Sequence, residues 1–422
     1  MTDPVAAPPA PYARPSSIID STLSVLAVFA AAALGLCAGL VPRGLPVWIN
    51  LVTLTALAAV IRWRTPVFPP PSRTGATLTA AFLGLAAASL LWTPAGRAPA
   101  TLGELAYIAA AALLAGVAIS TLAPAAAERL GLAAVAGLAV GIALFAVEMN
   151  AGFPLYHLFH GGKADPASQA FNVPKRAAAA LAVLVWPAAL VLYHRWGGRA
   201  AAALLAFLAL VSLSQTSRSA LAGLAVGGIV LLAARRWPGA AVRRGLAAVT
   251  VLAFVGAVPA ALLAERVAHL SDAGWLFQSA RHRVEIWDRA ATKILETPLL
   301  GQGLDSPRSV PAGGVTSKFE PMNTTLLPLH PHNAFLQVWF ELGAVGAALA
   351  AALLLLVLRA AGRLPAADRP FALALYAAGL TLSSTAYGIW QAWWMAALMG
   401  AALLTALAVR TPRRRPEETT TP

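Results

Sequence analysis

The feature that most constrains this chain is a run of about 20 apolar residues that recurs from Thr22 to Val409. Each run is long enough to cross about 30 Å of hydrocarbon as a helix. Hydrophobic residues make up 59% of the 422 residues and charged residues only 11%, which excludes a soluble domain. Hydropathy predicts an all-α polytopic membrane protein with about twelve transmembrane helices. The expected spans are 22–42, 45–61, 75–92, 101–123, 130–149, 177–193, 200–215, 219–234, 245–264, 333–358, 370–389 and 391–409.

The distribution of basic residues predicts the orientation, because Lys and Arg are enriched in cytoplasmic loops. An even number of spans places both termini on one side, and 18 of the 31 Lys and Arg residues fall on that side. Of the 13 on the other side, seven lie in one long segment, which this rule discounts. Both termini are therefore expected in the cytoplasm, with residues 1–21 and 410–422 as disordered tails. This loop charge also accounts for the net charge of +14, so no nucleic-acid partner is expected.

Two segments on the outer side are too long for simple turns, at roughly 150–176 and 265–332. The chain thus divides into spans one to nine over 22–264, a long outer loop over 265–332, and spans ten to twelve over 333–409. Within the loop, apolar residues recur at helical spacing at Val284, Trp287, Ala291, Ile294 and Leu295. The pattern predicts a short amphipathic helix over Arg281–Glu296 on the outer membrane face, followed by a turn over Thr297–Asp305.

Four arginines stand out because positive charge is sparse in short outer loops. Those expected near the outer interface are Arg176, Arg218, Arg281 and Arg283. One interpretation is structural: the side chains reach lipid phosphates or pair with Glu285 and Asp288. The other is a shared anionic ligand, since guanidinium groups bind phosphate oxygens in a two-pronged geometry and keep their proton. For the set as a whole, a diphosphate at the lipid–water boundary is the better hypothesis.

A pair of histidines precedes span ten. His332 comes directly before this apolar run, and His330 lies two residues earlier. Without a third ligand at useful spacing the pair is a weak metal site, and a lone interfacial histidine is often only a structural hydrogen-bonding group. A neutral imidazole at the level of the arginines can also take a proton from a sugar hydroxyl. His332 is the candidate base, with His330, Asn333 and Lys175 as candidate supporting residues.

The motifs of several enzyme classes are missing from the sequence. It contains no phosphate-binding loop with a Walker lysine, no Gly-x-Ser-x-Gly, no His-Glu-x-x-His and no Asp-x-Asp pair for a divalent metal. An ATP-dependent or nucleotide-sugar-dependent reaction is therefore not expected, and no metal or other cofactor is predicted. The single cysteine, Cys37, excludes an intrachain disulfide.

Three motifs together resemble the O-antigen ligase/polymerase superfamily. They are QTSRSA at Gln215–Ala220, RVEIW at Arg283–Trp287 followed by PLLGQG at Pro298–Gly303, and HNAFLQVWFELGAVG at His332–Gly346. Each motif is loose by itself. Their order and spacing, the twelve spans and the large outer segment extend the resemblance over nearly the whole chain.

This resemblance implies a glycosyltransferase of the GT-C-like class in the inner membrane of a Gram-negative bacterium, with its active site on the periplasmic side. It implies a donor glycan carried on undecaprenyl diphosphate and, in the ligase branch, transfer to a sugar of lipid A–core within membrane lipid. The family's motif residues fall on Arg218, Arg283 and His332, whereas topology alone places Arg176, Arg281 and His330. Direct attack on a glycosyl diphosphate would invert the anomeric centre, and arginines would replace a metal.

Alternatives remain open. An O-antigen polymerase would use a second lipid-linked glycan as acceptor, and a protein O-oligosaccharyltransferase would use a pilin hydroxyl; the ligase is favoured because no large domain follows the last span. Secondary transporters are a different class, but they place ionisable residues near the membrane midplane. Here the spans carry few such residues, chiefly Glu104 and Glu148 near span ends. A non-catalytic lipid-binding scaffold would need no histidine at the site.

Overall fold

The computed structural model describes residues 18–63, 72–160, 173–214, 217–310, 317–319 and 330–413. Within these ranges the chain forms α-helices and three short 3-10 helices, with no strand, which confirms the all-α prediction. The α-helices are α1 (Ile18–Leu40), α2 (Leu45–Trp63), α3 (Arg73–Ala88), α4 (Ala98–Ser120), α5 (Pro124–Asn150), α6 (Pro154–His160), α8 (Val173–Trp196), α9 (Gly198–Leu213), α10 (Arg218–Arg236), α11 (Gly239–Val255), α12 (Ala257–Arg266), α13 (Gln278–Glu296), α14 (Ala334–Gly362), α15 (Arg369–Thr385) and α16 (Ala392–Arg410).

Nine helices of the described chain are long and apolar enough to cross a membrane. The pair α11 and α12, bent by 62°, gives a tenth candidate span. Eleven of the twelve predicted ranges fall mainly on one helix each, whereas the range 245–264 falls on both α11 and α12. Helices α9 and α15 have only 16 and 17 residues. The chain is thus a multi-pass helical membrane protein by length and composition, and the count of twelve spans stays a prediction.

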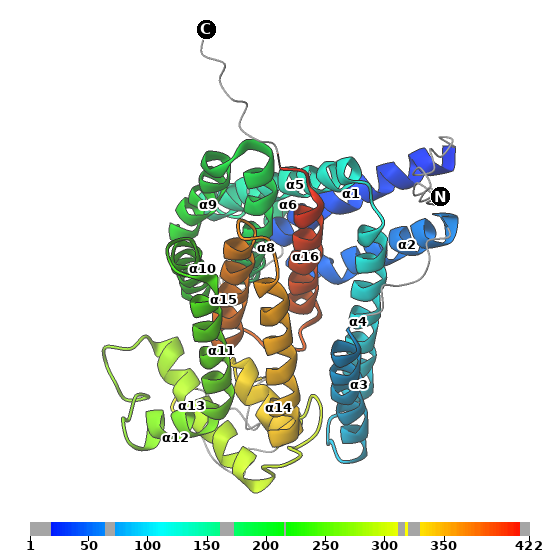
Figure 1. Ribbon diagram of the computed structural model, residues 1–422. Helices are drawn as coiled ribbons and strands as arrows, with labels where there is room; N and C mark the ends of the chain where they lie inside the picture. Colours follow the sequence, from blue (N-terminus) through cyan, green and yellow to red (C-terminus); the bar gives the residue numbers. More distant parts are fainter. Residues whose placement is uncertain are drawn as a thin grey trace.

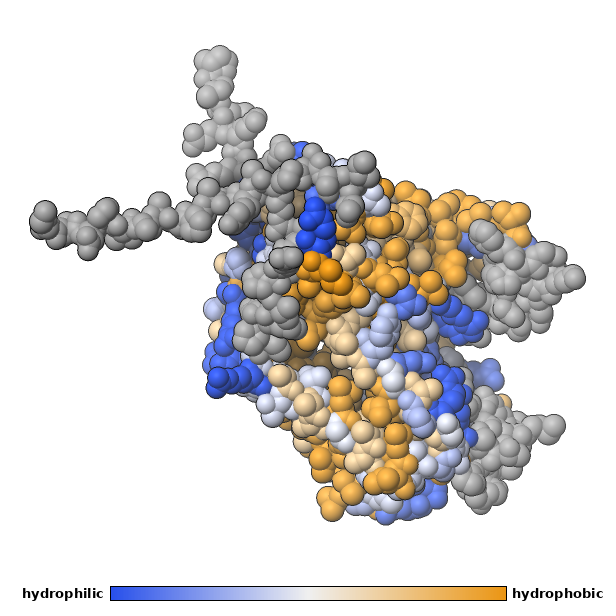
Figure 2. Space-filling view, turned by 90° about the vertical axis from the view of Figure 1, so that its right-hand side faces the viewer, coloured by the Kyte–Doolittle hydropathy of each residue, from blue (hydrophilic) through white to orange (hydrophobic). Residues whose placement is uncertain are grey.

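Large apolar side chains are exposed on several of these helices. Phe29 of α1, Leu54 of α2, Ile229 of α10 and Leu252 of α11 are each more than half exposed. Figure 2 shows apolar residues over much of one face of the molecule. Soluble monomers rarely expose apolar surface on this scale, whereas a lipid bilayer solvates it. The surface therefore agrees with the membrane assignment.

Helix α8 is the centre of the bundle. Every residue from Ala177 to Val191 is buried, and α8 contacts α5, α9, α15 and α16, which surround it in Figure 1. A helix that is apolar on all sides is stable only when other elements enclose it, and its alanines allow neighbouring helices to approach closely. This buried helix carries Lys175 and Arg176 in its first turn.

Glycines allow a close contact between α1 and α5. Gly35 and Gly39 of α1 lie against Gly137 and Gly141 of α5, and a Cβ at any of the four would overlap backbone atoms of the facing helix. In each helix the two glycines are four residues apart, which is the spacing of small residues at membrane helix interfaces. The sequence around these glycines thus fixes how closely the two helices pack.

The predicted amphipathic helix is present as α13, which begins three residues before its expected start and ends as expected at Glu296. Its apolar side chains, including Ile286, Ala290 and Ile294, pack in one cluster with residues of α12 and α14. This corrects the expectation that the apolar stripe lies on the membrane surface. Leu295, expected in that stripe, is 56% exposed. Figure 1 shows α12 and α13 together at one end of the molecule.

The predicted turn after α13 inserts into a kink of α14. The kink is at Gly343, whose φ of +60° is a conformation that L-residues with a side chain rarely adopt. The backbone N–H of Ala344 donates to the carbonyl of Pro298 at 2.8 Å. Farther along the turn, the carbonyl of Leu304 accepts from the hydroxyl of Thr93 at 2.7 Å. The turn therefore joins the kinked helix to the segment between α3 and α4.

We expect Gly137→Leu to lower the free energy of unfolding by about 1–3 kcal/mol, because the larger side chain overlaps the backbone of α1 and forces the two helices apart. The thermal unfolding midpoint of the full chain in detergent measures the effect. Gly116→Leu on α4 is the matched control, since a Cβ there meets no atom within 4 Å. Equal midpoints for the two variants would contradict this account of the α1–α5 contact.

Candidate active site

The end of α15 is the point at which the predicted site residues converge. The carbonyl of Thr385 accepts hydrogen bonds from Arg283 Nη1 at 2.5 Å and from Ser219 Oγ at 3.3 Å. The next carbonyl, of Ala386, lies 2.8 Å from His332 Nδ1. The last carbonyls of a helix have no partner within the helix, so they are available to bind side chains from α10, from α13 and from the segment before α14.

The hydrogen bond of His332 determines its tautomer. A carbonyl oxygen can only accept, so Nδ1 carries the proton and the basic lone pair is on Nε2. The residue has a φ of +56°, a left-handed conformation in which histidine is enriched. The carbonyl of the preceding Pro331 accepts from Trp287 Nε1 of α13 at 2.7 Å. Because the ring of His332 and the carbonyl of the preceding residue both have hydrogen-bond partners, the imidazole has a defined orientation.

His330 has a different environment. It is only 5% exposed, and its ring lies against Gly388, where a Cβ would come within 2.7 Å of Cδ2. Nδ1 accepts from the backbone N–H of His332 at 3.2 Å, and Nε2 lies 2.9 Å from Gln391 Nε2. Burial, together with the nearby His332, Arg308 and Arg283, lowers the pKa of His330 to about 3. The Nδ1 of His330 is occupied by the N–H of His332 and the ring is buried, so the geometry favours His332 as the base.

Positive charge accumulates around these histidines. Arg283 and Arg308 are within electrostatic range of His330, Lys175 is in range of Arg283, and Arg176 is in range of Arg43. Burial lowers the pKa of Arg283, which is nonetheless a permanently charged group. The arginines of this group are Arg43, Arg176, Arg283 and Arg308, and none of them pairs with a carboxylate in the described part of the chain. Such a concentration of charge is suited to a multiply charged anion.

The acids that were expected to pair with the site arginines have other partners. Glu285 pairs with Arg289 and also accepts from Ser317 Oγ at 2.8 Å. Asp288 pairs with Arg266 at 2.7 Å. The structural interpretation of Arg281 and Arg283 as partners of these two carboxylates is therefore wrong.

Arg218 begins α10 beside this group. Ser217 caps the helix, its Oγ accepting from the N–H of Ala220 at 3.4 Å, and Ser219 bonds to the Thr385 carbonyl. Arg218 itself is exposed, with its guanidinium carbon 3.2 Å from the centre of the Phe277 ring. The position is at the edge of the cluster, with the charged end stacked on an aromatic face.

Arg281 and Asn333 are not placed like the other candidates. Arg281 lies two positions from Arg283, about 200° around the helix, and its Nε donates to the carbonyl of Ser271 at 2.7 Å. The structure thus separates it from the cluster. Asn333 caps α14, because its Oδ1 accepts from the N–H groups of Phe335 and Leu336 at 3.0 and 3.1 Å. Its observed role is to begin the helix that follows His332.

Tyr387 is a site residue that the sequence analysis missed, because it fell inside the span predicted over 370–389. Helix α15 ends at Thr385, so Tyr387 lies in the following loop. The ring stacks edge-on against Trp393 at 4.7 Å, and the phenol is within electrostatic range of Arg176 and Arg283. Burial raises the pKa of Tyr387, so it remains a neutral donor. Gly388, which follows Tyr387, was the sequence signal for a helix that ends before residue 389. No sequence pattern pointed to Arg43 or Arg308.

A fully buried carboxyl group helps to hold the loop after α15. Glu341 of α14 accepts from Gln337 Nε2 and Trp390 Nε1, each at 2.7 Å, and from the N–H of Asp305 at 2.6 Å. Gln337 in turn accepts from the N–H of Ile389 at 2.9 Å. Through these hydrogen bonds the buried group is a structural anchor for the segment that carries Tyr387 and Gln391.

No three side chains of His, Cys, Asp or Glu come together as a possible metal site in the ranges that the structure describes. The expectation of a metal-independent reaction stays a prediction. The chemistry that the side chains themselves offer is the binding of a multiply charged anion next to a neutral imidazole.

Acidification should destabilise the protein through His330. The unfolded chain takes up this proton below a pH of about 6.5, whereas the native state binds it only near its pKa of about 3. Between these values the unfolded state holds more protons, so the free energy of unfolding rises with pH. The contribution of His330 to that free energy is lost progressively as the pH falls below about 6.5. At pH 5 the loss is about 2 kcal/mol at most.

Thermal unfolding at pH 7.5 and at pH 5 measures this effect. His330→Asn should lose less stability between the two values than the wild type. His269→Asn, at an exposed histidine with a φ of +46°, is the matched control and should follow the wild type. An equal acid-induced loss in all three proteins would show that another group is responsible.

Comparison with known proteins bears on this geometry. Residues 200–351 match the family model described as O-antigen ligase, and this region contains Arg218, Arg283 and His332. A protein of Rickettsia conorii named "Putative polysaccharide ligase" is 29% identical over 65% of this chain and 66% of its own length. A Rickettsia prowazekii protein of the same name is 28% identical over 61% of this chain and 63% of its own length. The chain thus spans just under two thirds of the length of these relatives. The resemblance seen in the sequence motifs is confirmed: this chain carries an O-antigen ligase family domain over residues 200–351.

Proposed function

We propose that this protein is an O-antigen ligase of the GT-C-like class, which transfers a glycan from undecaprenyl diphosphate to a sugar of lipid A–core. The observation that carries the proposal is the convergence of Arg283 and His332 on the adjacent carbonyls of Thr385 and Ala386. An imidazole of defined orientation near a cluster of arginines supports this proposal. The proposed location is the periplasmic face of a bacterial inner membrane, with both termini in the cytoplasm. The family domain and the polysaccharide-ligase names of the relatives support this reaction class.

The arginines and the imidazole have different tasks in the proposed reaction. The acceptor hydroxyl attacks the anomeric carbon while Nε2 of His332 takes its proton. The bond from the anomeric carbon to the diphosphate oxygen breaks, and its electron pair leaves with the diphosphate. Arg283, with Arg176 and Arg218 at the edges of the cluster, stabilises the charge that develops on this leaving group. Attack from the face opposite the diphosphate inverts the anomeric configuration.

A second function within the superfamily would differ only in the acceptor, as in an O-antigen polymerase or a protein O-oligosaccharyltransferase. A secondary transporter is less well supported. The fully buried carboxyl group within a described span, Glu341, accepts three hydrogen bonds from neighbouring groups, and these contacts indicate a structural role.

The acceptor is tested by reconstituting the purified full chain in liposomes with an undecaprenyl-diphosphate glycan, in buffer containing EDTA. Lipid A–core, a pilin peptide and a second lipid-linked glycan are offered separately. We expect transfer to lipid A–core alone. Transfer only to another acceptor would replace the ligase assignment, and activity that returned only on adding Mg²⁺ or Mn²⁺ would overturn the metal-independent mechanism.

Two variants test the roles of the base and of the anion-binding arginine separately. His332→Ala should bind the lipid-linked donor but transfer it about 10²–10⁴-fold more slowly, because removal of a general base has an effect of this size. Arg283→Lys keeps the charge but loses the two-pronged geometry, so donor binding should weaken. Donor binding and single-turnover transfer are measured separately for each variant.

Arg266→Ala is the control, because this guanidinium on the neighbouring helix is paired with Asp288. It should bind and transfer as the wild type does. A His332→Ala protein that lost transfer only through lost donor binding would remove the assignment of His332 as the base. Near-normal binding by Arg283→Lys would remove the two-pronged phosphate contact.

A further inference from the structure

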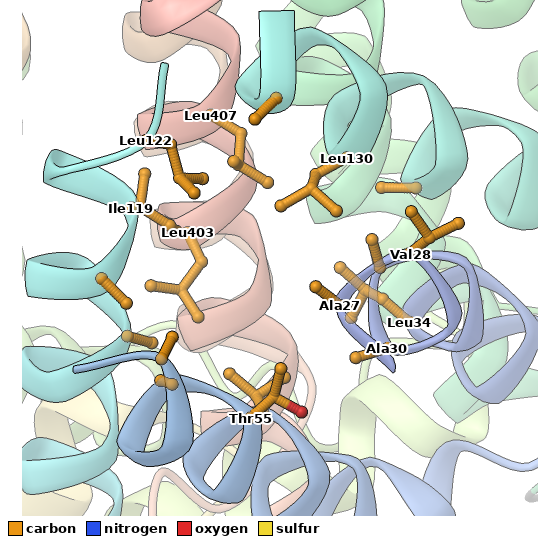
Figure 3. A pocket seen from close by; sticks show the side chains of 18 of the residues that line it. Ala27, Val28, Ala30, Leu34, Thr55, Ile119, Leu122, Leu130, Leu403 and Leu407 are labelled. Atoms are coloured by element: carbon orange, nitrogen blue, oxygen red, sulfur yellow. The ribbon is translucent and has the colours of Figure 1, made fainter. Parts of the chain in front are cut away.

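A cavity of about 190 Å³ lies between α1, α2, α4, α5 and α16. Figure 3 shows Leu403 and Leu407 of α16 on one side and Ala27 and Leu34 of α1 on the other. The cavity is lined mainly by leucine, alanine, valine and isoleucine side chains. It belongs to a different set of helix surfaces from those that form the candidate active site.

The distance along α16 separates the cavity from that site. Gln391, immediately before α16, contacts His330, whereas Leu403 lines the cavity. Twelve residues of α-helix correspond to about 18 Å. Likewise, α4 has Thr101 near the site end, bonded to Asp305, and Ile119 at the cavity. The cavity therefore lies toward the ends of α4 and α16 that are far from the candidate active site.

Apart from Arg129, the polar side chains that line the cavity have partners within the protein. Ser24 and Thr55 donate to carbonyls of their own helices, at 2.8 and 2.7 Å. Trp48 Nε1 donates to the carbonyl of Ala30 at 2.8 Å. An apolar cavity of this size stays dry and accepts apolar ligands. In a protein surrounded by lipid, the available apolar ligand is a hydrocarbon chain.

One charged residue, Arg129, is among the lining residues. It is exposed and forms no hydrogen bond or ion pair within the described ranges of the chain. The adjacent Glu128 is already paired with Arg195 at 3.1 Å. A guanidinium at the border of an apolar cavity is complementary to an amphiphile with an anionic phosphate and a hydrocarbon tail.

We propose that this cavity binds one acyl chain of an anionic phospholipid, with the lipid phosphate on Arg129. The apolar wall selects the chain, and the arginine selects the charge of the headgroup. The site is independent of the proposed glycan transfer, because it shares no residue with the arginine and histidine cluster.

The chain-binding part is tested with phosphatidylglycerol that carries a photoreactive group in one acyl chain, added to the purified full chain in detergent micelles. Crosslinks, mapped by peptide mass spectrometry, should fall on the cavity-lining residues of α1 and α16. Ala118→Phe places an aromatic ring into the cavity and should reduce these crosslinks about tenfold. Ala27→Leu fills less of the cavity and should reduce the crosslinks less. It replaces Ala118→Phe in the test if that variant does not fold.

Ala110→Phe is the matched control, because this exposed alanine is on α4 but does not line the cavity. It should crosslink as the wild type does. Cavity crosslinks that persist in Ala118→Phe, or crosslinks spread evenly over exposed helix faces, would overturn the proposed site.

The headgroup part is tested by competition. Unlabelled phosphatidylglycerol should displace the probe about tenfold better than phosphatidylcholine of the same chains, and Arg129→Gln should remove this preference. Arg199→Gln, at another exposed arginine, should retain it. Equal competition by the two lipids in the wild type would overturn the role of Arg129.

Discussion

The free carbonyls at the end of α15 are the constraint on which the candidate site depends. Because Arg283 and His332 are oriented by neutral carbonyls of Thr385 and Ala386 rather than by carboxylates, the guanidinium keeps its full charge. An acidic partner would have oriented the arginine equally well but would have cancelled the charge that a diphosphate needs. The same contact gives the histidine the tautomer with its lone pair on Nε2. One helix end thus orients both the proposed anion-binding arginine and the proposed base.

Placing several cations together is costly, and the surrounding fold supplies the compensation. The buried Glu341 fixes the loop after α15 through Gln337 and Trp390, and the kink at Gly343 accommodates the turn after α13. These contacts are satisfied within the protein, so they hold the arginines near one another without neutralising them. The apolar side of α13, the helix that carries Arg283, packs on α12 and α14. Arg283 is therefore held by packed helices.

The two ends of the bundle have different chemistry. At one end, arginines that pair with no carboxylate among the described residues lie near two histidines and a tyrosine. At the other, an apolar cavity is bordered by Arg129. Both arrangements are complementary to a phosphate, but only the first has histidines beside it. This difference is the reason that we propose a reaction for the first site and lipid binding for the second.

The sequence alone determined that the chain is a helical membrane protein, because runs of 20 apolar residues allow no other fold, and its three motifs indicated the O-antigen ligase family. It also named Arg218, Arg283 and His332, since charge at an apolar boundary is visible as a local pattern. Only the tertiary structure decided which candidates meet. Arg281 and Arg283 are two residues apart yet lie on different sides of α13, while Tyr387, Arg43 and Arg308 come from distant segments. The reason is physical: hydropathy and spacing report local periodicity, whereas contacts between helices depend on packing and on the carbonyls left free at helix ends.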